Sequence, residues 1–400
     1  MAENTKIEWA THSFNPWIGC TKVSPACKNC YAERDFDHRL GQVQWGPTGT
    51  RVLTSNDNWS KPLKWNRDAQ KEFEAAQAQW VSDCCWFGTK SYPEPELHQF
   101  RKRVFCASLA DVFEDWQGPI VNSKGERLWL ETASSTWIFA SKEDSERSEL
   151  ARQRGVRAGT MADVRQRLFS LIDATPNLNW LLLTKRPENI QKMWLAQHLD
   201  GGTTGRIREL MDEGESKDVH PYFRRNVWLG TSIENQGYVD QRIQEFLQCR
   251  DLSPVLFLSC EPLLGPIDLS YPDSLYPDGP EYCCSGFECG CRGLPIDPPA
   301  YLNKAFGGVD WVIAGGESGP QARPTDPEWF RSLRDQCQAA GVPFLFKQWG
   351  EFGPVAAATP AQLCKATFAS YKRGERLYRI GKAQAGRVLD GVTHNGFPNE

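Results

Sequence analysis

The chain has 400 residues and a formal net charge of −4, from 46 Lys and Arg residues against 50 Asp and Glu residues. This balance excludes a broad basic surface, so binding to nucleic acid would require a local basic patch. No apolar run approaches the roughly 20 residues that span a bilayer, and the polar start of the chain does not resemble a signal peptide. We therefore expect a cytoplasmic protein without membrane association, whose 14 cysteines are thiols and metal ligands.

Three cysteines near the start of the chain form the most distinctive group in the sequence. Six residues separate Cys20 from Cys27, and two separate Cys27 from Cys30. Proline and glycine residues interrupt the same stretch and predict a loop that follows a short strand. Thiolates favour zinc, Cu(I) or an iron-sulfur cluster, and no fourth ligand stands at zinc-finger spacing. We expect a metal centre with one open position; the alternative is a pair of buried cysteines, with the third cysteine uninvolved.

Six short apolar runs recur along the chain, and each ends in polar or glycine-rich sequence. Such runs are typical of strands that are buried on both faces of a parallel sheet. With one more strand before Cys20, they predict an α/β fold, a parallel partial (β/α) barrel of about six to seven strands. The six runs are 104–108, 180–184, 227–231, 255–259, 311–314 and 343–347.

Helices are predicted between these strands, because apolar residues recur at helical spacing. The last of these helices has clear end signals: Asp326 as N-cap, Pro327 at the first helical position and Gly341 just past the end. Pro187 is predicted to open another helix. The apolar residues at helical spacing lie within 161–171, 239–246 and, in the last helix, 330–337.

The remaining stretches are polar and charged, and we interpret them as surface insertions. They interrupt a single barrel domain that spans residues 1–400. The predicted insertions lie near 66–100, 114–160, 200–225 and 270–305.

Polar residues follow the predicted strands at the point where each strand ends. Barrels of this kind place their catalytic and binding groups at the carboxyl ends of the strands. We therefore expect these residues and the three cysteines to form one site. Basic residues of the same segments could contact phosphate or carboxylate groups. They are Lys185, Arg186, Arg323, Lys347 and Arg387.

Several long motifs resemble an uncharacterised phage and prophage protein family that carries a three-cysteine motif. The motifs are Leu183–Asn189, Asn226–Ser232, Leu258–Ile267, Gly315–Pro320, Phe346–Gly350 and Gly386–Gly391. That family is in turn similar to radical S-adenosylmethionine enzymes, with spore photoproduct lyase as a distant relation. Tyr31, directly after the last cysteine, also resembles the cluster loop of those enzymes. The chain departs from their usual loop by having more residues between its first two cysteines.

The resemblance implies a radical S-adenosylmethionine enzyme. Cys20, Cys27 and Cys30 would hold a 4Fe-4S cluster, and the methionine part of S-adenosylmethionine would bind the fourth iron. The reduced cluster would cleave this cofactor to a 5′-deoxyadenosyl radical, with flavodoxin or ferredoxin as electron donor. By position, the cofactor-binding residues would be Ser108, Asp111, Thr231, Ser232, Glu234, Glu261, Gly315, Gly316, Glu317 and Ser318.

The substrate and the catalytic residues are not specified by the sequence. None of the six histidines stands in a recognisable pairing of nucleophile and base, so hydrolysis by a triad is poorly supported. The phage context implied by the resemblance favours a nucleobase, nucleotide or nucleic acid as substrate, with a small metabolite as the alternative.

A second cysteine group supports a different function. Cys283, Cys284, Cys289 and Cys291 fall within nine residues, a spacing that suits zinc, an auxiliary cluster or an unliganded loop. The N-terminal cysteines could pair with this group around zinc. The chain would then be a nucleic-acid-binding or structural module of phage origin without catalysis.

Overall fold

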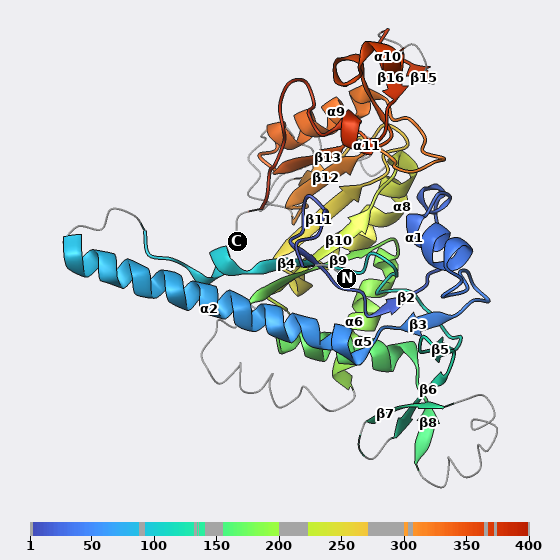
Figure 1. Cartoon of the computed structure of the whole chain (residues 1–400), viewed down its shortest axis with the longest axis vertical. Helices are drawn as coiled ribbons and strands as arrows, with labels where there is room; N and C mark the ends of the chain where they lie inside the picture. The colour runs from blue at the N-terminus through green and yellow to red at the C-terminus, as the bar shows by residue number, and fades with distance from the viewer. Residues whose placement is uncertain are drawn as a thin grey trace, which may run out of the picture.

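The largest sheet of the protein contains seven parallel strands, whose order in the sheet is their order in the chain. It curls into a half-barrel (Figure 1), which confirms the predicted α/β fold and partial barrel. Its strands are β1 (His12–Ser13), β4 (Lys102–Cys106), β9 (Leu178–Thr184), β10 (Val227–Ser232), β11 (Val255–Cys260), β12 (Trp311–Gly315) and β13 (Phe344–Gln348). The computed structural model describes residues 3–87, 93–131, 134, 136–140, 155–199, 223–270, 300–302, 307–363, 367–371 and 374–398.

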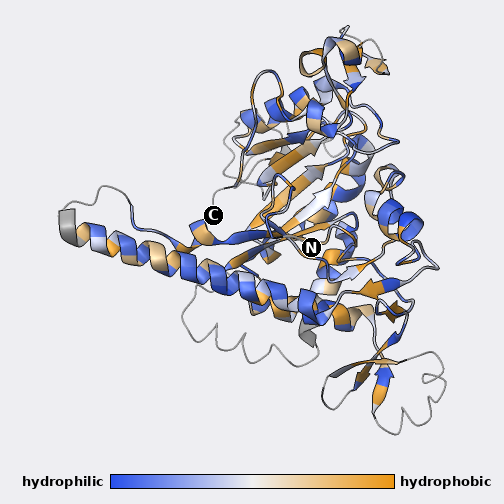
Figure 2. Ribbon diagram, in the orientation of Figure 1, coloured by the Kyte–Doolittle hydropathy of each residue, from blue (hydrophilic) through white to orange (hydrophobic). Residues whose placement is uncertain are grey.

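The outer face of the sheet packs against helices. The central strands β10 and β11 are buried along their whole length, which explains their continuous apolar sequence. Figure 2 shows the main strands as largely hydrophobic segments. The helices that share their core are α5 (Met161–Asp173), α6 (Ile190–Leu199), α8 (Gln236–Leu247) and α9 (Pro327–Ala339).

The inner face of the sheet carries a separate aromatic cluster. Trp9, from the segment before β1, lies 4.4 Å from the ring of Phe105 and 6.5 Å from that of Trp311. Phe397, near the other end of the chain, lies 5.1 Å from the ring of Trp311. Segments close to both chain ends therefore cover the inner face, and in Figure 1 both end labels lie beside the sheet.

The helix signals are confirmed by the structure. The Asp326 side chain accepts a hydrogen bond from the backbone of Glu328 and caps α9, with Pro327 at the first position. Gly341 follows the helix with φ of +65°, a left-handed conformation that favours glycine. Pro187 opens a 3-10 turn (Pro187–Asn189) that leads directly into α6.

The predicted insertions contain regular structure of their own. Helix α2 (Asn56–Phe87) has 32 residues and projects away from the sheet in Figure 1, and Figure 2 shows it as mostly hydrophilic. A second sheet has the order β2-β3-β5-β6-β7, with β8 paired to β6. Its strands are β2 (Trp17–Ile18), β3 (Arg51–Leu53), β5 (Ile120–Val121), β6 (Arg127–Glu131), β7 (Thr136–Ala140) and β8 (Val156–Ala158).

A small antiparallel sheet lies near the C-terminal end of the chain. It consists of β14 (Phe352–Pro354), β16 (Arg376–Arg379) and β15 (Phe368–Ser370), in that order. Among the helices of the described ranges, none combines the length and apolar character needed to cross a membrane. Short helical segments are η1 (Pro25–Cys27), α1 (Tyr31–Glu33), the π-helix η2 (Arg34–Arg39), η3 (Leu97–Phe100), η5 (Arg250–Leu252), η8 (Ala300–Leu302), η10 (Val355–Ala357), α10 (Pro360–Leu363) and α11 (Lys382–Ala385).

Two of the predicted features lie wholly or mostly outside the residues that the structure describes. Most of the insertion near 200–225 and most of that near 270–305 lie outside the described residues. The second cysteine group, Cys283, Cys284, Cys289 and Cys291, lies there as well.

Candidate functional site

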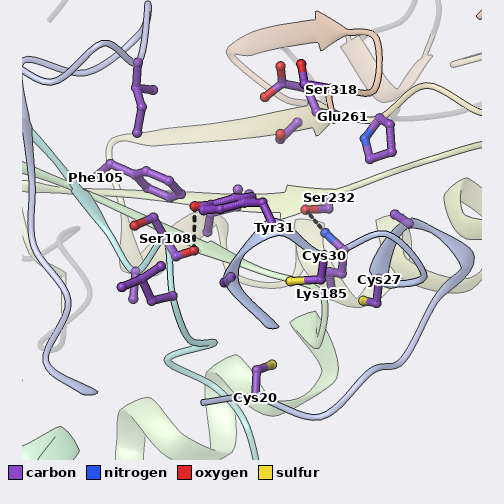
Figure 3. A pocket seen from close by; sticks show the side chains of 18 of the residues that line it. Cys20, Cys27, Cys30, Tyr31, Phe105, Ser108, Lys185, Ser232, Glu261 and Ser318 are labelled. Carbon is purple, nitrogen blue, oxygen red and sulfur yellow. Dashed lines mark hydrogen bonds between the residues drawn. The ribbon is translucent and has the colours of Figure 1, made fainter. Parts of the chain in front are cut away.

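A cavity of about 720 Å³ lies at the carboxyl ends of the half-barrel strands. Each of the seven strands ends in a residue that lines it or is followed by one. The loop that joins β2 to α1 brings Cys20, Cys27 and Cys30 to the same cavity, and Figure 3 shows them with Tyr31, Lys185 and other wall residues. The volume is within the roughly 300–1,000 Å³ of small-molecule and cofactor sites.

Most of the site residues predicted from the sequence line this cavity. They are Cys20, Cys27, Cys30, Ser108, Asp111, Ser232, Glu261, Gly316, Glu317 and Ser318. Thr231, Glu234 and Gly315 do not line it. Thr231 donates a hydrogen bond to the carbonyl of Thr184. A Cβ on Gly315 would lie 2.4 Å from Oε1 of Glu261, so glycine lets that carboxylate pack against the strand.

Two carboxylates from strand ends hold the cysteine loop. Ser24 donates to Oε1 of Glu234 at 2.6 Å, and this fully buried carboxylate also pairs with Arg242 at 2.9 Å. Asn29 donates to Oε2 of Glu317 at 3.2 Å. Glu234 and Glu317 thus connect the loop to β10 and β12.

Arg323 strengthens the second of these anchors. Its Nη2 lies 2.6 Å from Oε1 of Glu317, and its Nη1 donates to the Pro25 carbonyl at 3.1 Å. Arg323 therefore reaches the loop from outside the cavity wall. Arg387, another basic residue singled out in the sequence, also lies off the cavity and donates to Asn395.

Arg186 links Cys20 to a buried acidic pair. Its Nη1 lies 3.8 Å from Sγ of Cys20 and donates to Oδ2 of Asp111 at 2.8 Å. Its Nη2 donates to the Thr21 carbonyl at 2.7 Å and lies 3.5 Å from Oε1 of Glu114. Arg186 is nearly buried, so it fixes the start of the loop in a protected environment.

Behind this network, Arg51 holds Glu114 in place. Its Nε and Nη2 each donate to a different oxygen of Glu114 at 2.7 Å, a bidentate pair that is buried on both sides. The ring of Trp116 lies 3.8 Å from the guanidinium of Arg51. Every buried charge in this group has an opposite partner, as buried charges require.

Burial favours the protonated form of two of the three thiols, those of Cys20 and Cys30. The pKa of Cys20 is raised to about 12 by burial and by the carboxylates of Glu114 and Asp111, while Arg186 opposes the shift. Burial also raises the pKa of Cys30. A metal centre would therefore have to displace protons from these thiols as it binds.

The three cysteines are the candidate metal ligands of this cavity. Among the described residues, no group of three or more His, Cys, Asp or Glu side chains is placed to hold one metal ion. A 4Fe-4S cluster distributes its thiolates over different irons, so its ligands surround a space instead of meeting at a point. Cys20, Cys27 and Cys30 form no disulfide and line one cavity, so all three thiols are available on its wall.

Other polar side chains of the wall are held in defined positions. Lys347 donates to Oε2 of Glu261 at 3.0 Å, while Oε1 of the same carboxylate is buried without a hydrogen bond. Lys185 donates to Ser232 at 2.9 Å and Tyr31 donates to the Ser108 carbonyl at 2.7 Å, both drawn in Figure 3. The wall thus offers two lysines and a carboxylate with an unused acceptor.

The sequence reasoning missed one part of the wall. Lys6, Glu8, Trp9 and Lys382 line the cavity but follow none of the predicted strands. No spacing signal identifies them, because they reach the site only when segments from near both chain ends fold onto the half-barrel.

The sequence matches the model of a protein family over residues 4–157 and 156–398, which includes the cysteine loop and all seven strands of the half-barrel. The chain belongs to this family, described as "Protein of unknown function (DUF5131)". No curated protein and no solved structure matches the chain. The match agrees with the predicted membership of an uncharacterised family of phage type. The similarity to radical S-adenosylmethionine enzymes and spore photoproduct lyase stays a prediction.

Proposed function

We propose that this protein is a radical S-adenosylmethionine enzyme with a 4Fe-4S cluster on Cys20, Cys27 and Cys30. One observation supports the proposal above all others: three free thiols line a single cavity at the carboxyl ends of a parallel half-barrel. When bound and reduced by flavodoxin or ferredoxin, the cluster supplies the electron that cleaves S-adenosylmethionine to methionine and a 5′-deoxyadenosyl radical.

The roles of the protein residues follow from their contacts. Glu234 and Glu317 position the cysteine loop through Ser24 and Asn29. Lys185 and Lys347 place positive charge on the wall, which suits the carboxylate of an amino-acid cofactor. Glu261 keeps one oxygen available for a hydroxyl or amino group.

The substrate class in this proposal is a nucleobase, a nucleotide or a nucleic acid. The competing function is the zinc-bearing, non-catalytic module in which the N-terminal cysteines pair with the second cysteine group. Metal content separates the two functions, because brown protein with iron and sulfide supports the first and colourless protein with zinc supports the second.

Replacing any one of Cys20, Cys27 or Cys30 by Ala should remove most of the iron and the broad visible absorption of anaerobically reconstituted protein, because three thiolates carry all of the protein ligation. Iron, sulfide and zinc analysis of each variant is the measurement. Cys84→Ala is the matched control, since this half-buried thiol on α2 does not line the cavity. Full cluster content in all three single variants would end the proposal.

The reaction has its own test. With dithionite and S-adenosylmethionine, reconstituted protein should slowly release methionine and 5′-deoxyadenosine, because many enzymes of this type cleave the cofactor without substrate. Chromatography of anaerobic reactions should detect both products, and the triple Cys-to-Ala variant should yield neither. If protein with full cluster content releases neither product, even with nucleic-acid substrates added, the radical assignment is wrong.

A further inference from the structure

One wall of the cavity is formed without the cysteine loop. The segment Thr5–Trp9, which precedes β1, lines it together with Lys382 at the start of α11. Its charged side chains are Lys6, Glu8 and Lys382, which we call the N-terminal wall. None of the contacts that hold the cysteine loop involves these three residues, so they are available for another ligand.

Glu8 is the acceptor of this wall, and its bonding is incomplete. The side chain is only 18% exposed, and its Oε2 is shielded from solvent without accepting a hydrogen bond. The nearest cation, Nζ of Lys382, lies 3.8 Å from Oε1, which is too far for a hydrogen bond. Burying an unpaired carboxylate oxygen costs stability, so a ligand with N–H donors would complete this site.

The lysines give the N-terminal wall a net positive charge. Lys6 is exposed and has no ion pair within the described part of the chain, and Lys382 has only the distant contact to Glu8. Two ammonium groups against one carboxylate leave one positive charge unbalanced. A ligand that carries a phosphate would balance it, whereas a zwitterionic amino acid would not.

Aromatic side chains complete the surroundings. Trp9 and Phe105 both line the cavity beside the N-terminal wall, with ring centroids 4.4 Å apart. Their buried rings provide an apolar floor that suits a flat heterocycle. The ligand that matches an N–H acceptor, a positive charge and an apolar floor is a nucleotide.

We propose that Lys6, Glu8 and Lys382 form a nucleotide subsite, in which Glu8 accepts hydrogen bonds from the base and the lysines contact the phosphate. This inference rests on the proposed function, in which the cavity is the active site. It adds the residues that would recognise the substrate. Nucleotide binding requires no electron transfer, so it can be measured apart from cluster content and cofactor cleavage.

The test is titration calorimetry of the full chain with AMP, GMP, CMP and UMP, each of which carries an N–H donor on its base. At least one should bind, its nucleoside should bind at least tenfold more weakly, and inorganic phosphate should compete. Glu8→Gln and Lys382→Met should each weaken that nucleotide at least tenfold, because charge-assisted hydrogen bonds are lost. Glu74→Gln and Lys71→Met, at exposed positions on α2, are the matched controls and should not change binding.

A single-stranded oligonucleotide with the same terminal base distinguishes two sources of this ligand. Tighter binding of the mononucleotide assigns the subsite to free nucleotides, and tighter binding of the oligonucleotide assigns it to nucleic-acid ends. The inference is overturned if neither kind of probe binds at millimolar concentration, or if the variants bind as the parent does. Lys382→Met keeps the test decisive if Glu8→Gln does not fold. Iron content separates this inference from the proposed function. If the protein binds a nucleotide through Glu8 but holds no cluster, the subsite is supported and the radical enzyme is not.

Discussion

Arg186 is the residue through which the start of the cysteine loop is tied to the protein interior. It contacts Cys20, Asp111 and Glu114 together, and its side chain is 9% exposed. In such a group each buried charge is stabilised by a partner of opposite charge, and removing one partner leaves the others buried and unpaired. The loop therefore depends on a guanidinium that comes from the end of β9.

Arg186→Gln should lower the free energy of unfolding by about 3 kcal/mol, the scale expected when one partner of a buried ion pair is removed. Arg186→Lys should recover part of the loss, because it restores the charge but not the branched geometry. Urea unfolding is the measurement. As a control, Arg39→Gln should change stability by less than about 1 kcal/mol. Arg39 is 68% exposed, and its Nε lies 3.7 Å from Oδ1 of Asp35, too far for a hydrogen bond. Similar small changes in both variants would contradict the role given to Arg186.

At this scale the sequence predicted which residues lie at the strand ends, but not what each one contacts. Glu234 and Glu317 follow their strands as expected, yet both face the loop, bonded to Ser24 and Asn29. Their partners are 210 and 288 residues away along the chain. A strand-end position indicates the edge of the sheet where a side chain lies, whereas hydrogen-bond partners depend on how distant segments meet.

At the scale of elements, the sequence predicted a helix correctly where it contains signals for both helix ends. Helix α9 has its cap, its first-turn proline and its terminal glycine in the sequence, and it forms where predicted. Helix α2 was not predicted, because its sequence is polar over most of its length and contains Pro62 in its second turn. Strand β1 is only two residues long, so its position depends on its neighbours more than on its own sequence.

His12 shows how β1 depends on those neighbours. Its ring lies 4.6 Å from the ring of Trp65 on α2, and its Nδ1 is 2.9 Å from the hydroxyl of Thr11. Burial lowers the pKa of His12 below its ordinary value of 6.5. The unfolded chain therefore takes up a proton more readily than the folded chain does. The His12 contribution to stability is complete above that ordinary pKa and is lost as the pH falls below it.

Stability measured by urea unfolding should thus fall from about pH 7.5 to about pH 5.5, and His12→Gln should reduce this dependence. The comparison with the variant isolates His12 from other titrating groups, including His394, whose pKa is also lowered by burial. An identical pH dependence in both proteins would show that His12 does not couple β1 to folding.

At the scale of the whole molecule, the half-barrel was predictable because six of its seven strands coincide with apolar runs, and helices directly follow β9, β10 and β12. Chain order and right-handed crossovers then leave few arrangements for such units. The second sheet was not predictable, since it combines β2 and β3 with strands that follow β4 in the chain. The cavity shape depends on both sheets and on the segment before β1, so its volume could not be inferred from any local pattern.

The aromatic inner face has a consequence for synthesis of the protein on the ribosome. The indole of Trp311 donates to the Gly396 carbonyl at 2.8 Å, and the ring of Phe397 lies beside the guanidinium of Arg103 at 4.3 Å. The last strand of the half-barrel ends at Gln348, so all seven strands are made before these closing residues emerge. A nascent chain that has just completed the half-barrel still lacks the contacts of Trp311 with Gly396 and Phe397. Part of the aromatic inner face therefore stays uncovered until translation reaches residue 397, and transiently exposed apolar surface of this kind makes a nascent chain prone to aggregation.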